Sequence, residues 1–258
     1  MTLAADDYGL DPEIDRAIQE LTKKKIVNKV SVLANPTYPT ELPKLSNHVE
    51  TGLHVNLTTP WPKQTQNHPP SPWQLLRASL KRRLSTDVLI AQISQQLALL
   101  KSRGLAISFL DTHHHVHLIP RILHALIHVA QHQNIEHVRC LTMRFRHFPG
   151  YVYALVKYGF ISQIPRILTL YTCGLAMKAS LDRAGLSYCP NLVIMPLATG
   201  GDYPGLLQTL LHQFQHQNAE FVTHPGFASQ HLPNEPYVKG RTQEYQALLS
   251  CIQTPGET

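Results

Sequence analysis

Residues 86–117 read TDVLIAQISQQLALLKSRGLAISFLDTHHHVH and contain the unit that decides the fold. The first half is amphipathic, with an apolar stripe at helical spacing formed by Leu89, Ile93, Leu97 and Leu100. Gly104 ends this predicted helix, and an apolar run typical of a buried strand follows from residue 106. A helix that leads directly into a buried strand predicts β-α units around a parallel sheet or barrel.

The same alternation of strands and helices continues on both sides of this unit. Upstream we expect a strand stub at 1–5, a helix beginning at Asp11–Pro12, a strand around Val30 and Val32, a strand at 52–58, and helices at 73–84 and 86–103. Downstream we expect strands at 137–141, 192–195 and 220–223, and one or two helices within 151–181. The Pro-rich residues 59–72 are predicted to be a loop that forms one wall of a cleft. No repeat or linker divides the chain, so we predict one domain over residues 1–258, with 251–258 as a tail.

Composition limits the classes of function. Hydrophobic residues make up 43% of the 258 residues and charged residues 16%, which is typical of a globular protein. The net charge of +6 could attract nucleic acid, an anionic membrane or an acidic substrate, but the basic residues are dispersed and form no nucleic-acid-binding module. The four cysteines show no C-x-x-C spacing, and we find no signal peptide and no apolar run of membrane-spanning length. A cytoplasmic protein is the expectation.

Polar residues that can carry chemistry follow the predicted strands. They are Asp6 and Asp7 after the first strand, His54 in the third, Asp111 and His113 at the end of the fourth, and His224 after the last. Barrel and open-sheet α/β enzymes build their sites at the carboxyl ends of strands, so this shared placement predicts one site. Taken singly, Asp6-Asp7 could be a surface pair, and His54 a buried histidine bonded to the backbone.

The run DTHHHVH (111–117) is the strongest of these signals. If the strand stays extended, Asp111, His113, His115 and His117 project from one face, and His114 points away with a structural role. Burying an acid and three imidazoles without a partner is costly, and a bound cation supplies one. Two imidazoles and a carboxylate suit Zn²⁺, Mn²⁺, Fe²⁺ or Co²⁺ better than Mg²⁺. Such a site activates water for hydrolysis of an amide or ester.

Four motifs in this order resemble the YdjC-like carbohydrate deacetylase family, which includes the chitooligosaccharide deacetylases. They are ADDYG (5–9), GLHVNLT (52–58), DTHHHVHLIP (111–120) and THPG (223–226), and they extend over most of the chain. The resemblance implies an α/β fold, a deformed (β/α) barrel of the polysaccharide-deacetylase type. It also implies cleavage of the acetamido group of N-acetylglucosamine-type sugars, carried by an oligosaccharide or a glycolipid.

The resemblance also assigns roles to individual residues. Asp7, His54 and His113 match the metal ligands, Asp6 the catalytic base and His224 the general acid. His115, His117 and Arg139 would line the substrate site. The implied cofactor is one divalent ion, with Mg²⁺ and Zn²⁺ both left open. Asp6 would deprotonate a water that the metal activates, and His224 would protonate the leaving amine.

Two features depart from the family pattern. The first strand is short, which would weaken the support beneath Asp6 and Asp7, and the segment between Arg139 and Pro196 matches no motif. The basic and apolar character of that segment suits ordinary packed helices most simply. A substrate groove or peripheral contact with a membrane, as in the hopanoid-associated branch of the family, is a second interpretation. A homodimer also stays open.

Rival functions are another metallohydrolase, either an amidohydrolase or a phosphoesterase, and a non-catalytic carbohydrate-binding relative. The first two place an H-x-H strand near the N-terminus, whereas here two aspartates come first. A mere binder needs no acid and base, so the presence of Asp6 and His224 favours an enzyme.

Overall fold

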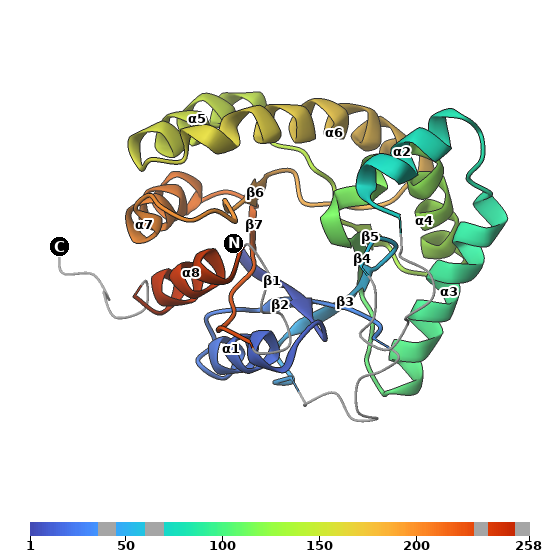
Figure 1. Ribbon diagram of the computed structural model, residues 1–258, viewed down its shortest axis with the longest axis horizontal. Coiled ribbons are helices and arrows are strands. Elements are labelled where there is room, and N and C mark those ends of the chain that lie inside the picture. The colour runs from blue at the N-terminus through green and yellow to red at the C-terminus, as the bar shows by residue number, and fades with distance from the viewer. Residues whose placement is uncertain (36–44, 60–69, 230–236, 251–258) are drawn as a thin grey trace.

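One curled parallel sheet lies at the centre of the computed structural model, with helices packed around its outside (Figure 1). The structure describes residues 1–35, 45–59, 70–229 and 237–250, so most of the predicted Pro-rich loop (60–69) and the tail (251–258) lie outside the described residues. The described strands are β1 (Thr2–Tyr8), β2 (Lys29–Val32), β3 (Glu50–Val55), β4 (Phe109–Thr112), β5 (His137–Val138), β6 (Leu192–Ile194) and β7 (Glu220–Thr223).

The strand order β5-β4-β3-β2-β1-β7-β6 makes the sheet a half-barrel. Every neighbouring pair is parallel, and β1 lies between β2 and β7, which comes from the far end of the chain. The two edge strands do not pair with each other. The segments beside these edge strands, β5 and β6, are linked by two backbone hydrogen bonds. One runs from Val138 N to Ser187 O (3.0 Å) and the other from Leu192 N to Thr142 O (2.8 Å). The predicted deformed barrel is confirmed.

The helices of the outer layer alternate with the strands as predicted. They are α1 (Pro12–Lys23), α2 (Pro72–Leu80), α3 (Thr86–Ser102), α4 (Pro120–His132), α5 (Phe148–Lys157), α6 (Ile164–Ala184), α7 (Tyr203–Phe214) and α8 (Val238–Ser250), with 3₁₀ turns η1 (His113–Leu118), η2 (Phe145–His147) and η3 (Ile161–Gln163). No helix in the described part of the chain is both long and apolar enough to cross a bilayer.

Local sequence signals account for the helix ends. Asp11 caps α1 by accepting a hydrogen bond from Glu13 N at 2.8 Å, and Pro12 occupies the first helical position, as predicted. In α3 the predicted apolar stripe is the buried face. These two helices follow the sequence closely because caps and stripes act within a few residues of chain.

The strand ends differ from the predictions. β1 is not a stub: it continues through Asp6 and Asp7 to Tyr8. Residues 4 and 5 pair with both β2 and β7, and Tyr8 pairs with Val32 of β2 after a register shift. β3 ends at Val55, three residues early. The fourth strand was predicted to run through residue 117 but ends at Thr112. There the Thr112 hydroxyl accepts a hydrogen bond from His117 N at 3.0 Å, which closes the chain into η1.

The edge strands β5 and β6 are also shorter than the predicted 137–141 and 192–195. β5 has only two residues. Arg139 N makes the last hydrogen bond to β4, at Leu110 O, and the chain then reaches β6, where the Thr142 carbonyl accepts a hydrogen bond from Leu192 N. The helical segment predicted at 151–181 forms two helices, α5 and α6.

Gly174 allows α6 to approach this connection closely. A Cβ atom built there would lie 1.7 Å from the Leu141 carbonyl oxygen, far inside van der Waals contact. The obstacle is backbone rather than a flexible side chain, so the helix would have to shift outward.

We therefore expect Gly174→Ala to destabilise the protein by about 1–3 kcal/mol, the usual cost of overpacking. Thermal unfolding should show a melting temperature lower by roughly 2–10 °C for a chain of this size. Gly150→Ala in α5 is the matched control, because its Cβ would meet only the side chain of Gln213. Equal melting temperatures for both variants would contradict the close approach.

Candidate metal centre and cavity

The carboxyl ends of the central strands surround a cavity of about 280 Å³. Six of the eight predicted site residues line it: Asp6, Asp7, His54, His113, His115 and His224. They come from β1, β3, η1 and the segment after β7, which are far apart in the sequence. Parallel pairing of β1, β2, β3 and β4 places the strand ends at one edge of the sheet, which brings these six residues together in one cavity.

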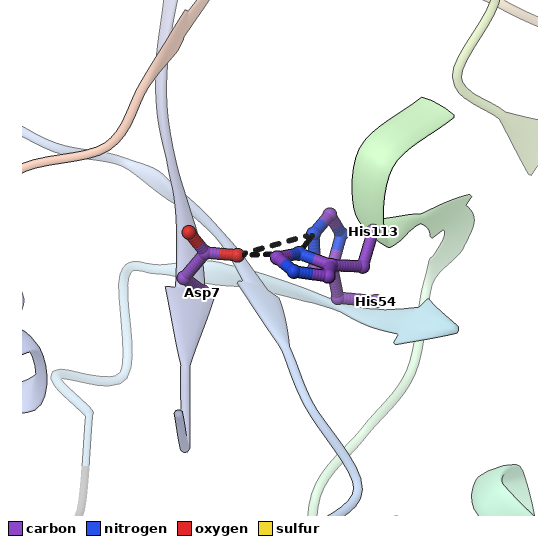
Figure 2. A group of neighbouring side chains, drawn as sticks. All are labelled: Asp7, His54 and His113. Carbon is purple, nitrogen blue, oxygen red and sulfur yellow. Dashed lines mark hydrogen bonds and ion pairs between the residues drawn. The ribbon is translucent and has the colours of Figure 1, made fainter. Parts of the chain in front are cut away.

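Three of these side chains form a compact cluster, which Figure 2 shows. Asp7 Oδ1 lies 2.9 Å from His113 Nδ1 and 3.5 Å from His54 Nε2, and the two ring nitrogens are 3.3 Å apart. All three side chains are nearly buried, with 2% of Asp7, 3% of His54 and 10% of His113 exposed. These are the three residues that match the family's metal ligands in the motif resemblance described above.

A backbone irregularity in β1 brings both aspartates to the cavity. The pairing register with β2 shifts between Ala5 and Tyr8, and Asp7 has a φ of 71°, a left-handed conformation that is uncommon for a residue with a side chain. Neighbouring residues of a regular strand point to opposite faces. The bulge removes that alternation, so both carboxylates line the cavity.

Charged neighbours fix the orientation of Asp7. The Arg241 guanidinium donates to Asp7 Oδ2 at 2.7 Å and leaves Oδ1 directed at the two histidines. Burial alone would raise the pKa of Asp7. Because His113 and Arg241 stabilise its charge, the pKa instead lies well below the ordinary value, and Asp7 is an anionic ligand.

His54 is oriented by a carboxylate behind it. Asp111 Oδ1 lies 2.8 Å from His54 Nδ1, so the ring donates its Nδ1–H there and turns the Nε2 lone pair toward Asp7 and His113. Burial opposes a positive charge on His54, but Asp111 and Asp6 outweigh it and raise the pKa to about 10. The surroundings therefore favour a cation at this position.

The cluster fits a divalent metal ion. Asp7 Oδ1 is buried and has no hydrogen bond of normal geometry among the described residues, although two ring nitrogens face it. Two imidazoles and one carboxylate form the donor set of transition-metal hydrolase sites. A cation between the three atoms would satisfy the carboxylate oxygen and both nitrogen lone pairs.

Asp6 lies beside the trio and is held from behind by Arg139. The Arg139 Nη1 atom donates to Asp6 Oδ1 at 2.9 Å and to Oδ2 at 2.7 Å. Burial raises the pKa of Asp6 above its ordinary value, even though the Arg139 charge acts in the opposite direction. A carboxylate with a raised pKa is suited to accept a proton.

The structure places Arg139 and His117 behind the cavity rather than in its lining. Arg139 is 1% exposed and bonds Glu220 and Asp111 as well as Asp6. His117 is fully buried, and its Nδ1 lies at 2.5 Å from the Thr112 hydroxyl. We therefore do not propose direct substrate contact for these two residues.

His115 and His224 both face the cavity as neutral imidazoles. Burial lowers the pKa of His224 to about 3 and that of His115 well below its ordinary value. The Nδ1 atom of each is buried and has no hydrogen-bond partner among the described residues. His224 Nε2 lies 4.0 Å from Asp6 Oδ2, so the predicted acid and base are neighbours.

Four cavity residues were missed by sequence reasoning or were assigned differently. His114, predicted to be structural and to point away, lines the cavity because His114 and His115 take left-handed conformations in η1. Its ring lies against that of His113, with centroids 3.9 Å apart. Arg166 and Tyr237 also line the cavity, as does Arg241. These three stand on or beside helices as isolated polar residues, and nothing in their spacing marks them as part of a site.

Glu244 is a further buried carboxyl next to the cavity. Its Oε2 accepts a hydrogen bond from His224 N at 2.7 Å, which fixes the chain that carries His224. Burial raises the pKa of Glu244 to about 8, so this carboxyl can hold a proton near neutral pH. In the sequence, Arg241 and Glu244 look like ordinary charged residues on the solvent-exposed face of a helix, so the pattern does not mark them as part of a site.

Together these features define a class: an α/β half-barrel protein with an Asp-His-His cluster at the carboxyl ends of its strands. The chain belongs to the YdjC-like protein family, whose model matches residues 1–251. A carbohydrate deacetylase of Mus musculus is 27% identical over 54% of this chain and 49% of its own length. The chitooligosaccharide deacetylase of Proteus mirabilis is 27% identical over 49% of this chain and 53% of its own length.

The chain thus matches about half the length of these curated relatives. Among solved structures, a proposed cellobiose-phosphate cleavage protein of Enterococcus faecalis superimposes with a TM-score of 0.64. That match covers 96% of this chain and 89% of the other at 15% identity, so it establishes the fold alone.

The neutral state of His117 predicts a pH dependence of stability. Burial lowers its pKa from 6.5 to about 3, so between these values the unfolded chain binds a proton that the folded chain does not. Stability should therefore fall as the pH drops from 6.5 toward 3. In the presence of a chelator, His117→Asn should reduce the slope of unfolding free energy against pH by about 1.4 kcal/mol per pH unit.

Urea unfolding at several pH values would measure this slope. The matched control is His212→Asn, because that side chain is exposed to water in both states. An unchanged slope in His117→Asn would mean that His117 is charged in the folded protein.

Proposed function

We propose that this protein is a metal-dependent hydrolase that removes the acetyl group from an N-acetylated sugar. The observation that carries the proposal is the convergence of the Asp7, His54 and His113 cluster with Asp6 and His224 in one cavity. Membership of the YdjC-like family and the names of the curated relatives support a carbohydrate deacetylase.

We assign Asp7, His54 and His113 as the ligands of one divalent ion, with Zn²⁺ favoured over Mg²⁺ because two of the three donors are imidazole nitrogens. When bound, the ion would polarise the acetamide carbonyl and lower the pKa of a water molecule. Arg241 and Asp111 hold two of the ligands in place, through Asp7 Oδ2 and His54 Nδ1 respectively.

Asp6 is proposed as the general base. Its carboxylate lines the cavity beside the cluster, and its raised pKa favours uptake of a proton from the attacking water. Arg139 keeps both oxygens of Asp6 hydrogen-bonded from the buried side, which limits rotation of the carboxylate.

His224 is proposed to pass a proton to the leaving amine. Because its pKa is lowered to about 3, His224 enters the reaction neutral and must receive this proton during the cycle. Asp6 Oδ2, 4.0 Å from His224 Nε2, is in position to supply the proton that it has accepted. Acetate and a free amino sugar would then leave the cavity.

The orientation of His54 gives a direct test of metal binding. Asp111→Asn would present an amide instead of a carboxylate to Nδ1 and favour the wrong imidazole tautomer. We expect Zn²⁺ affinity, measured by competition with a chelating dye, to fall about 10–100-fold, as for other lost ligand-orienting partners. Asp87→Asn, at an exposed position in α3, should leave the affinity unchanged. Equal affinity in both variants would exclude this role for Asp111.

Acetate release from N-acetylglucosamine oligomers, measured with metal-reconstituted protein, tests the reaction itself. His113→Ala should abolish metal binding and activity together. Asp6→Asn should retain the metal but lower kcat by about 10²–10⁴-fold, the usual contribution of a general base. His212→Ala is the matched control, since this histidine is exposed on α7.

The pattern across the variants separates the outcomes. If His113→Ala loses the metal but the wild type releases no acetate, the metal centre is supported and this substrate class is rejected. Phosphoesters and other amides would then be assayed, because the same centre could serve a different metallohydrolase.

A further inference from the structure

The helices α5 and α6 and the short turns η2 and η3 that precede them carry an unusual concentration of exposed apolar side chains. Six of the eleven large hydrophobic residues that are exposed in the described chain fall between residues 145 and 175. They are Phe145 (86% exposed), Tyr153 (65%), Val156 (44%), Ile161 (59%), Leu168 (46%) and Leu175 (65%), and we call them, with the basic residues below, the α5–α6 surface. Scattered apolar residues are ordinary on a protein surface, but a cluster this dense indicates a contact site.

The charge of the α5–α6 surface has one sign. Residues 137–181 contain no Asp or Glu, while Arg144, Arg146, Lys157 and Arg166 are exposed there. Within the described ranges none of these four side chains forms an ion pair; Arg146, for example, bonds only His147 and Gln217. Their positive charge is therefore available to an anionic partner.

An apolar groove lies within this surface. It has a volume of about 230 Å³ between η2 and α6, and its walls include Met143, Phe145, Phe148, Leu168 and Leu175. Three of the six exposed apolar residues, Phe145, Leu168 and Leu175, thus line a recess that can accept a hydrocarbon group.

The α5–α6 surface is close to the cavity. Figure 1 shows α5 and α6 along one outer edge of the molecule, outside the sheet. The first turn of α6 supplies Arg166 to the cavity lining, and α6 packs on η1, the turn that carries His113. A partner bound at this edge would therefore lie beside the cavity.

We propose that the α5–α6 surface docks the protein on a membrane containing anionic phospholipids. Exposed aromatic and aliphatic side chains would enter the boundary of the acyl chains, while Arg144, Arg146 and Lys157 pair with the lipid phosphates. This combination is that of a segment that lies on a bilayer without crossing it.

Self-association through this surface fits the charges less well. A two-fold dimer would bring identical patches together, so the arginines and lysine of one copy would face those of the other without a carboxylate from this segment. An anionic lipid surface neutralises the same charges. Charge complementarity therefore favours the membrane over a second copy of the chain.

Docking would also give the cavity access to a sugar held at the lipid headgroup. That consequence rests on the proposed deacetylase function. Docking itself does not, so we test it by binding rather than by turnover, and failure of one proposal is distinguishable from failure of the other.

The experiment is cosedimentation of the full chain with vesicles. One set is pure phosphatidylcholine, and the other contains about one third phosphatidylglycerol, at low salt and at about 1 M salt. We expect binding to the anionic vesicles that weakens at high salt, and little binding to the neutral ones. Lys157→Gln should weaken binding about fivefold, the effect of one basic residue near such a surface.

Apolar insertion has its own matched pair of variants. Ile161→Ser, at 59% exposure, should weaken binding several-fold, whereas Val88→Ser on α3, at 55% exposure, should not. Lys23→Gln on α1 is the corresponding control for charge. Thermal unfolding of all variants confirms that each is folded.

Two results would overturn the proposal. The first is that the protein sediments equally with neutral and with anionic vesicles, or that anionic vesicles sediment no more protein than is found in their absence. The second is an equal effect of Ile161→Ser and Val88→Ser. A dimer in solution that Ile161→Ser converts to monomer, without any vesicle binding, would assign the α5–α6 surface to self-association instead.

Discussion

The buried guanidinium of Arg139 is the interaction on which the arrangement of the sheet and the site depends. It lies just beyond β5, and it bonds Asp6 on β1, Asp111 on β4 and Glu220 at the start of β7. Its Nη2 also donates to the Ser31 hydroxyl on β2. Each carboxylate would be strongly destabilising alone in this interior, and the guanidinium would be as well. Their mutual neutralisation fixes strands from both halves of the chain relative to one another, so the position of Asp6 follows from that of Arg139.

Backbone conformation does the rest of the positioning. The bulge in β1 and the left-handed conformation of Asp7 direct two adjacent carboxylates into one cavity. The left-handed pair His114 and His115 turns the chain immediately after β4, so that His113 meets His54. Such conformations are unfavourable for residues with side chains and persist only where surrounding contacts enforce them. Their concentration at the cluster is itself evidence for a functional site.

The metal centre and the α5–α6 surface favour partners of opposite charge. Around the cluster, the pKa values of Asp7 and Asp111 lie well below the ordinary value and the pKa of His54 is raised to about 10, so these surroundings favour a cation. From residue 137 to residue 181 the sequence contains basic residues but no Asp or Glu, which favours an anionic partner there. The net charge of +6 therefore sums a centre that favours a cation and a surface that favours an anion, and the total alone does not distinguish them.

The sequence by itself determined the alternation of strands and helices, the caps and stripes of α1 and α3, and the polar residues at the strand ends. These features depend on contacts within a few residues, so they can be predicted from the sequence. The run DTHHHVH indicated a bound cation because it is hard to bury without one, and the resemblance to the YdjC-like family implied Asp7, His54 and His113 as its ligands. Only the tertiary structure decided where β4 ends, that His114 faces the cavity, and that Arg139 lies behind Asp6 and outside the cavity lining. Those outcomes depend on hydrogen bonds and ion pairs between residues far apart in the chain, such as Arg139 with Asp6. The local sequence pattern does not predict such contacts.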